Sequence, residues 1–164
     1  MYTFLVIVHV VTAVLFLGPV TYAVSKFQGE ALKAHAGDER AGATARLLHK
    51  VTTSYGVLSL LVPLIGVAVM FTDPATYWTD GRFHIAIALA VVAWAILIFV
   101  IIPKQKKMAG TLGLFGEDEI DPDEAFSVNN WDKAKSQLSM FGGVFCLLWV
   151  LLAIIMFLPV NFGL

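Results

Sequence analysis

The sequence predicts an all-α integral membrane protein, a bundle of four helices with both termini outside. Of its 164 residues, 59% are hydrophobic and only 14% are charged, whereas soluble domains have about 45–50% apolar and about 25% charged residues. Four segments are long and apolar enough to cross a bilayer, which takes roughly 20 residues. Because the net charge is −1, we do not expect a nucleic-acid partner.

The predicted helices are residues 2–25, 51–71, 83–103 and 138–160. Together they form a single membrane domain of residues 1–164 with two long loops, 26–50 and 104–137. The first segment has no basic region ahead of it and is too long for the apolar part of a signal peptide, so we expect it to be a retained helix. Cys146 lies inside the fourth segment, where packing is its expected role.

The basic residues predict the orientation. The chain has eleven Lys and Arg residues, and all except Arg82 lie in the two long loops. Basic residues favour the cytoplasmic side. We therefore expect both long loops to be cytoplasmic, with the two termini and the short 72–82 connection on the outside of a bacterial plasma membrane.

His9 is the one ionisable residue within the core of a predicted span, and it shares a helix face with Thr12, Ala13 and Phe16. One role is a polar contact with a neighbouring helix. The alternative is a haem or copper ligand, which needs a second ring at a similar depth. His84 is the other histidine on that side, but it lies near the surface, whereas His9 lies roughly 10 Å below it. We expect packing by His9 and no cofactor or metal.

Small residues recur every three or four positions along two spans: Gly56, Ser59, Pro63 and Gly66 in the second, and Ser139, Gly143 and Cys146 in the fourth. Membrane helices pack closely through such faces, and Pro63 is expected to kink its helix because it has no N–H. A larger partner protein is the alternative occupant of one face. The positions expected to pack helices are His9, Gly56, Ser59, Pro63, Gly66 and Gly143.

The loops carry further signals. The 26–50 loop is expected to extend the first two helices, with a turn at Gly37–Asp38. Ser127 or Asn129 is expected to cap the fourth helix. The acidic run 117–124 lacks the glycine and the ligand spacing of a calcium loop, so we expect it to be solvated or to dock on a basic patch of a partner.

Three lysines follow the third span at the level of the lipid headgroups: Lys104, Lys106 and Lys107. Each is expected to attract anionic lipid by about 1 kcal/mol. Topology determination alone is the simpler explanation for the cluster.

The pattern points away from catalysis. The cores of the four spans contain no Asp, Glu, Lys or Arg, which are the residues that ion carriers place within the membrane. Ser54 and Ser59 have no His–Asp pair of the kind that acyl transfer needs, and "GTLGLFG" lacks the lysine of a phosphate-binding loop. Transport of a small neutral solute stays possible because Pro63 and Gly66 can break the second helix.

The opening "LVIVHVVTAVLFLGPVTYA" contains the pattern H-V-x-x-A-V-x-x-x-G-P from His9 to Pro19. It resembles the first helix of a family of small four-helix bacterial membrane proteins, and chain length and topology are similar throughout. The chain also resembles the actinobacterial, prokaryotic respiratory supercomplex associated factor-like members of that family. This resemblance implies a non-catalytic accessory subunit that packs against respiratory cytochrome subunits, in the assembly of cytochrome bcc with cytochrome c oxidase.

Overall fold

The computed structural model describes residues 1–116, 119 and 124–158. These residues form helices and their connections, without strands. Four helical segments are long and apolar enough to cross a membrane, and they are Tyr2–His35, Glu39–Met70, Gly81–Thr111 and Trp131–Phe157. The predicted all-α class and its four apolar helices are therefore confirmed, as expected for a multi-pass membrane protein.

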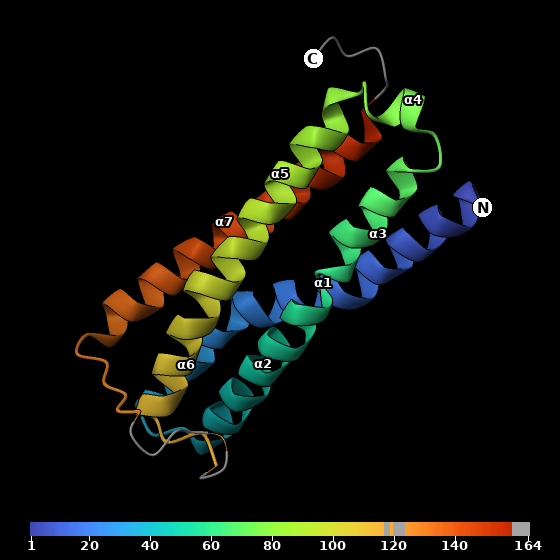
Figure 1. Cartoon of the computed structure of the whole chain (residues 1–164). Helices are drawn as coiled ribbons and strands as arrows, with labels where there is room; N and C mark the ends of the chain where they lie inside the picture. The colour runs from blue at the N-terminus through green and yellow to red at the C-terminus, as the bar shows by residue number, and fades with distance from the viewer. Residues whose placement is uncertain (117–118, 120–123, 159–164) are drawn as a thin grey trace.

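The helices run up and down in chain order (Figure 1). One end carries Met1, the short helix α4 and Leu158, and we call it the α4 end. The opposite end carries the connections 36–38, 112–116 and 124–130, and we call it the loop end. The elements are α1 (Tyr2–His35), α2 (Glu39–Leu58), α3 (Leu61–Met70), α4 (Pro74–Tyr77), α5 (Gly81–Ile96), a π-helical turn (Leu97–Ile101), α6 (Ile102–Thr111) and α7 (Trp131–Phe157).

At the loop end the helices continue past the predicted spans. The turn between α1 and α2 contains Gly37 at a φ of +100°, a conformation that glycine adopts without steric cost. Asp38 then caps α2 by accepting a hydrogen bond from the Ala41 N–H at 3.1 Å. The predicted helix extensions and their turn are confirmed.

The predicted cap of α7 was wrong. Asn130, not Ser127 or Asn129, accepts a hydrogen bond from the backbone N–H of Lys133 at 2.8 Å. The helix therefore begins at Trp131, well before the apolar run, because its first two turns are polar. Residues 159–160 of the predicted span lie outside the described residues.

The second span is interrupted between α2 and α3, as the position of Pro63 predicted. Pro63 cannot donate to the carbonyl of Ser59, four residues earlier. The N–H of Val62 donates to that carbonyl instead, at 3.1 Å. Leu60 likewise donates to Val57 at 3.1 Å, so tight i→i+3 bonds replace the α-helical ladder at this point.

The third span contains a similar adjustment before Pro103. The π-helical turn Leu97–Ile101 directly precedes α6, and Pro103 is in the first turn of α6. Because Pro103 has no N–H, the carbonyl of Phe99 loses its regular donor. The i→i+5 bonds of a π turn accommodate this local change of register. The third span thus continues unbroken to Thr111.

The core lies toward the loop end. On α1 the fully buried side chains are Val20, Ala23, Val24, Phe27 and Ala31, and this part of the helix packs against α2, α6 and α7. Before Val20, the one buried residue of α1 is Thr12. Toward the α4 end, α3 packs mainly against α1, and α5 packs mainly against α7. The molecule is therefore tightly packed at one end and divided into two helix pairs at the other.

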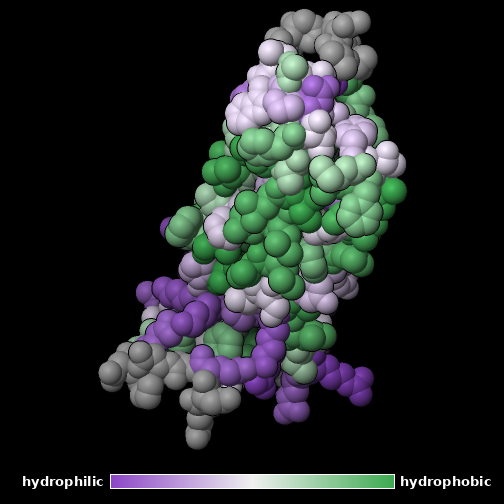
Figure 2. All heavy atoms as spheres, turned by 45° about the vertical axis from the view of Figure 1, so that its right-hand side comes forward, coloured by the Kyte–Doolittle hydropathy of each residue, from purple (hydrophilic) through white to green (hydrophobic). Residues whose placement is uncertain are grey.

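The surface also differs between the middle of the molecule and the loop end. Figure 2 shows a broad hydrophobic band across the middle of the displayed face, with strongly hydrophilic side chains gathered at the loop end. A band of this kind is the surface that a helical membrane protein presents to lipid.

One glycine of α7 allows α7 to approach α1 closely. A Cβ atom on Gly142 would lie 3.0 Å from Val24 Cγ1 and 3.4 Å from the Val24 carbonyl oxygen, whereas a Cβ on Gly143 would have no neighbour within 4 Å. Within the chain, the packing glycine is therefore Gly142 and not the predicted Gly143. The buried face of α7 is displaced by one residue from the predicted stripe, and it consists of Leu138, Gly142, Phe145 and Trp149.

We predict that Gly142→Leu lowers the free energy of unfolding in detergent micelles by about 1–3 kcal/mol, because the added side chain overpacks the α1–α7 contact. Gly143→Leu is the matched control and is expected to have little effect. Titration with a denaturing detergent, followed by circular dichroism, measures both variants. Equal destabilisation by the two substitutions would contradict the assigned helix face.

Candidate functional site

His9 lies in the contact between α1 and α3. A Cβ atom on Gly66 would lie only 3.0 Å from His9 Cε1, so the absence of a side chain at Gly66 makes room for the imidazole. The ring also lies beside the backbone carbonyl of Val62. Its Nδ1 atom is buried without a hydrogen-bond partner among the described residues. The structure thus places His9 against α3, while its role as a polar contact stays a prediction.

His84 has different neighbours at the α4 end. Its Nδ1 atom is 3.2 Å from the carbonyl oxygen of Asp80, and its ring centroid is 6.3 Å from that of Trp78. Within the part of the chain that the structure describes, no group of three or more His, Cys, Asp or Glu side chains converges to hold a metal ion. His9 and His84 thus have different neighbours, Gly66 of α3 for His9 and Asp80 with Trp78 for His84.

The remaining predicted packing residues lie on two contacts. A Cβ on Gly56 would lie 3.1 Å from Leu97 Cδ2. The Gly56 carbonyl accepts hydrogen bonds from Trp94 Nε1 at 3.2 Å and from Ser59 Oγ at 2.7 Å. Gly56 therefore joins α2 to the third span, whereas the hydrogen bond of Ser59 stays within its own helix. Pro63 is half-buried and acts through the break described above.

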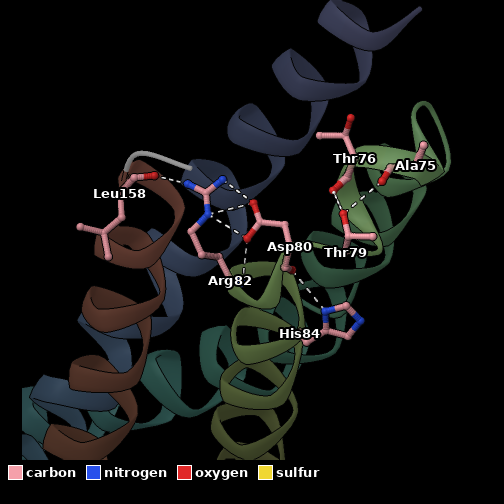
Figure 3. A network of polar contacts seen from close by, with 7 residues as sticks. All are labelled: Ala75, Thr76, Thr79, Asp80, Arg82, His84 and Leu158. Atoms are coloured by element: carbon pink, nitrogen blue, oxygen red, sulfur yellow. Dashed lines mark hydrogen bonds and ion pairs between the residues drawn. The ribbon is translucent and has the colours of Figure 1, made fainter. Parts of the chain in front are cut away.

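An ion pair lies at the start of α5, and its arginine also contacts the residue that follows α7 (Figure 3). Arg82 Nη2 lies 2.5 Å from Asp80 Oδ2, and Arg82 Nη1 donates to the carbonyl of Leu158. Asp80 also accepts from the backbone N–H of Arg82 at 3.0 Å, as the cap of α5. The side-chain hydrogen bond from Arg82 lowers the pKa of the Asp80 carboxyl. The single basic residue outside the two long loops thus has a structural role.

The lysine cluster divides into two groups at the loop end. Lys104 donates to Gln137 Oε1 at 2.9 Å. Lys106 instead forms an ion pair with Glu124 at 2.5 Å. Lys104 and Lys107 line a cavity of about 340 Å³ between α6 and the beginning of α7, to which Lys133 also contributes. The cavity therefore includes two of the three predicted headgroup lysines, excludes Lys106, and adds Lys133, which the sequence analysis missed.

A buried polar pair lies deeper at the loop end. His49 Nδ1 is 3.3 Å from Gln105 Oε1, and the imidazole packs against the rings of Phe27 and Phe115. Gln105 is fully buried and its Nε2 atom has no partner among the described residues. The sequence did contain a signal, because Gln105 lies four residues after the apolar Ile101 on one helix face.

Two described residues of the acidic run contact the chain itself. Glu119 pairs with Lys50 at 2.6 Å and with Arg46 at 2.9 Å, and Glu124 pairs with Lys106. Glu124 is exposed and Glu119 is partly exposed, which agrees with a solvated run, and both also form ion pairs within the chain. Docking on a partner stays a prediction. Residues 117–118 and 120–123 lie outside the described residues.

No family model, no curated protein and no solved structure matches this chain. Function therefore has to be inferred from the exposure, charge and polar contacts of the chain itself. Three features remain as candidates: the α1–α3 contact at His9, the weakly covered face of α1, and the basic cavity at the loop end.

The carboxyl of Glu119 predicts a pH dependence. The hydrogen bond from Lys50, with further ones from the Gly116 backbone and Arg46, lowers its pKa from 4.5 to about 2. Because the folded-state pKa is depressed, the stabilisation is fully present above about pH 4.5 and is lost as the pH falls toward 2.

Glu119→Gln removes this titration. We expect the difference in free energy of unfolding between the wild type and Glu119→Gln to be constant above about pH 5 and to shrink at lower pH. A difference that is as large near pH 2 as at neutral pH would show that Glu119 does not form these ion pairs.

Proposed function

We propose that this chain is a non-catalytic accessory subunit of a bacterial respiratory supercomplex, in which cytochrome bcc is joined to cytochrome c oxidase. Its role is to support the assembly or stability of that complex. It is a multi-pass protein of the plasma membrane, and the basic residues favour a cytoplasmic loop end with both termini outside. The segment His9 to Pro19 resembles the first helix of a family of small four-helix bacterial membrane proteins of unknown function. The resemblance of actinobacterial members of that family to the prokaryotic respiratory supercomplex associated factor supports this assignment.

The observation that carries the proposal is the poor coverage of the first span by its own chain. In an 18-residue apolar stretch of α1, only 11% of the residues are buried within the chain. The corresponding shares are 28% for the second and third spans and 17% for the fourth. The other half of the same helix, toward the loop end, lies in the core. The α4-end half of α1 therefore continues from a packed segment, and most of its own side chains are exposed.

The open part of α1 is apolar and contains one small residue, Gly18, near the core. We call this surface the α1 docking face, and it consists of the exposed residues Phe4, Ile7, Val10, Val11, Val14, Leu15 and Gly18. A Cβ atom on Gly18 would have no neighbour within 4 Å. An exposed glycine allows the backbone of a partner helix to approach closely.

Pro19 leaves a backbone carbonyl on this face in need of a hydrogen-bond donor. Because Pro19 has no N–H, the carbonyl of Leu15 lacks its α-helical donor. Lipid tails supply no hydrogen bonds, so an unsatisfied carbonyl in the bilayer is costly. A helix of a cytochrome subunit that packs on Gly18 would cover this surface. A polar side chain on that helix would donate a hydrogen bond to the Leu15 carbonyl.

The test is purification of a tagged chain in a mild detergent, with the haem absorbance of the co-migrating material as the readout. We expect the wild-type chain to co-migrate with cytochromes. Gly18→Leu is expected to reduce the co-migrating haem by about tenfold, because it blocks close helix approach. The matched control is Gly143→Leu, since Gly143 is equally free of neighbours within the chain.

Migration of the wild-type chain alone, free of cytochromes, would contradict the proposal. Equal loss of haem in the Gly18→Leu and Gly143→Leu variants would contradict the assigned face. The separated chain is also examined for haem and copper. A bound haem or copper that is lost in His9→Ala would favour a membrane redox protein instead.

A further inference from the structure

We infer that the cavity at the loop end binds one phosphate group of an anionic membrane lipid. The cavity has a volume of about 340 Å³ and lies between α6, the connection before α7 and the first turns of α7. Its size is at the lower end of small-molecule sites, which range over about 300–1,000 Å³. A headgroup fits this volume, and a whole lipid does not. The inference does not depend on the proposed accessory role.

Three lysines from two helices converge on the cavity. Lys104 and Lys107 are three residues apart on α6 and therefore share a helix face, and Lys133 lies in the first turn of α7. All three line the cavity. Such convergence concentrates positive charge around one cavity. Lys104 is partly buried there, whereas Lys107 and Lys133 are exposed.

The described carboxylates do not neutralise this charge. Among the residues that the structure describes, Lys33, Lys50 and Lys106 each have a carboxylate oxygen within 2.7 Å. The lysines of the cavity form no such ion pair there, and the partner of Lys104 is the neutral amide of Gln137. Asp132, the acidic residue of the first turn of α7, is exposed and does not line the cavity.

The beginning of α7 contributes neutral donors. Asn130 caps the helix through the N–H of Lys133, which leaves other N–H groups of the first turn without intrahelical acceptors. These groups and the helix dipole favour an anion at this end. The side-chain amides of Asn129 and Gln137 also line the cavity. Phosphate oxygens are strong acceptors for ammonium and amide donors alike.

The position along the third span identifies the phosphate as that of a lipid. Lys104 follows Arg82 by twenty-two residues of one continuous helical segment, which is roughly 33 Å at 1.5 Å per residue. The hydrocarbon core of a bilayer is about 30 Å thick. With Arg82 at one interface, Lys104 lies at the other, beside the headgroups. Met108, Val128 and Ala134 give the cavity an apolar wall for the glycerol part of a lipid.

Lys106 provides an internal control. It has the same charge, lies on the same helix between Lys104 and Lys107, and does not line the cavity. Its Nζ atom is directed to Glu124 at 2.5 Å and lies 5.7 Å from the centre of the Phe126 ring. General attraction to an anionic surface would involve Lys106 as much as Lys104 and Lys107. A defined site involves only the lysines that line the cavity, which are Lys104, Lys107 and Lys133.

The test uses the full chain in a neutral detergent, with native mass spectrometry during titration with phosphatidylglycerol or phosphatidylcholine. We expect one phosphatidylglycerol to bind at least about tenfold more tightly than phosphatidylcholine. The triple variant Lys104→Gln, Lys107→Gln, Lys133→Gln is expected to lose this preference. Lys106→Gln is expected to keep it within about twofold, since its charge is already paired. Circular dichroism checks that each variant is folded.

Three outcomes would overturn the inference. The first is a loss in Lys106→Gln as large as in the triple variant, which would indicate general attraction without a site. The second is equal binding of the two lipids. The third is displacement of phosphatidylglycerol by an equal concentration of inorganic phosphate, which would indicate a site for a soluble anion. If the triple variant does not fold, the exposed Lys107 is replaced alone, and a partial loss is expected.

Discussion

The fold depends on the face of α1 that runs from Val20 to Ala31. Its side chains are fully buried and form the surface on which α2, α6 and α7 pack. Since lipid tails provide no hydrophobic gain for helix association, this close packing has to hold the bundle together. Gly142 brings α7 against the backbone of Val24. The same contacts orient the exposed half of α1, so the α1 docking face is presented by a rigid support.

Backbone hydrogen bonding imposes the second constraint. Three spans contain a proline, and each proline removes one donor from a helix that has no water to replace it. Tight turns before Pro63 and a π turn before Pro103 adjust the helical register within the chain. At Pro19 the affected carbonyl belongs to Leu15, on the exposed face of α1. A polar side chain from the proposed partner helix would supply the hydrogen bond that this carbonyl lacks.

Hydropathy predicted the four helices, and the missing N–H of Pro63 predicted the break in the second span, because both effects are local. Small-residue spacing was a weaker guide. The same signals missed the polar beginning of α7, since its turns after Asn130 carry no apolar pattern. They also placed the packing stripe on Gly143 instead of Gly142, because neighbouring helix faces differ by one residue and the sequence does not identify the partner helix. Which lysines share a cavity depends on tertiary structure, so Lys133 was not predictable.

The most direct test of the central claim is photo-crosslinking in native membranes from a reactive residue placed at Val14, on the α1 docking face. Phe99 is the control position, because it is also strongly exposed and apolar but lies on the third span. Our account predicts a crosslink from position 14 to a cytochrome subunit and no such crosslink from position 99. Equal crosslinking from both positions, or crosslinks to lipid alone at position 14, would contradict it.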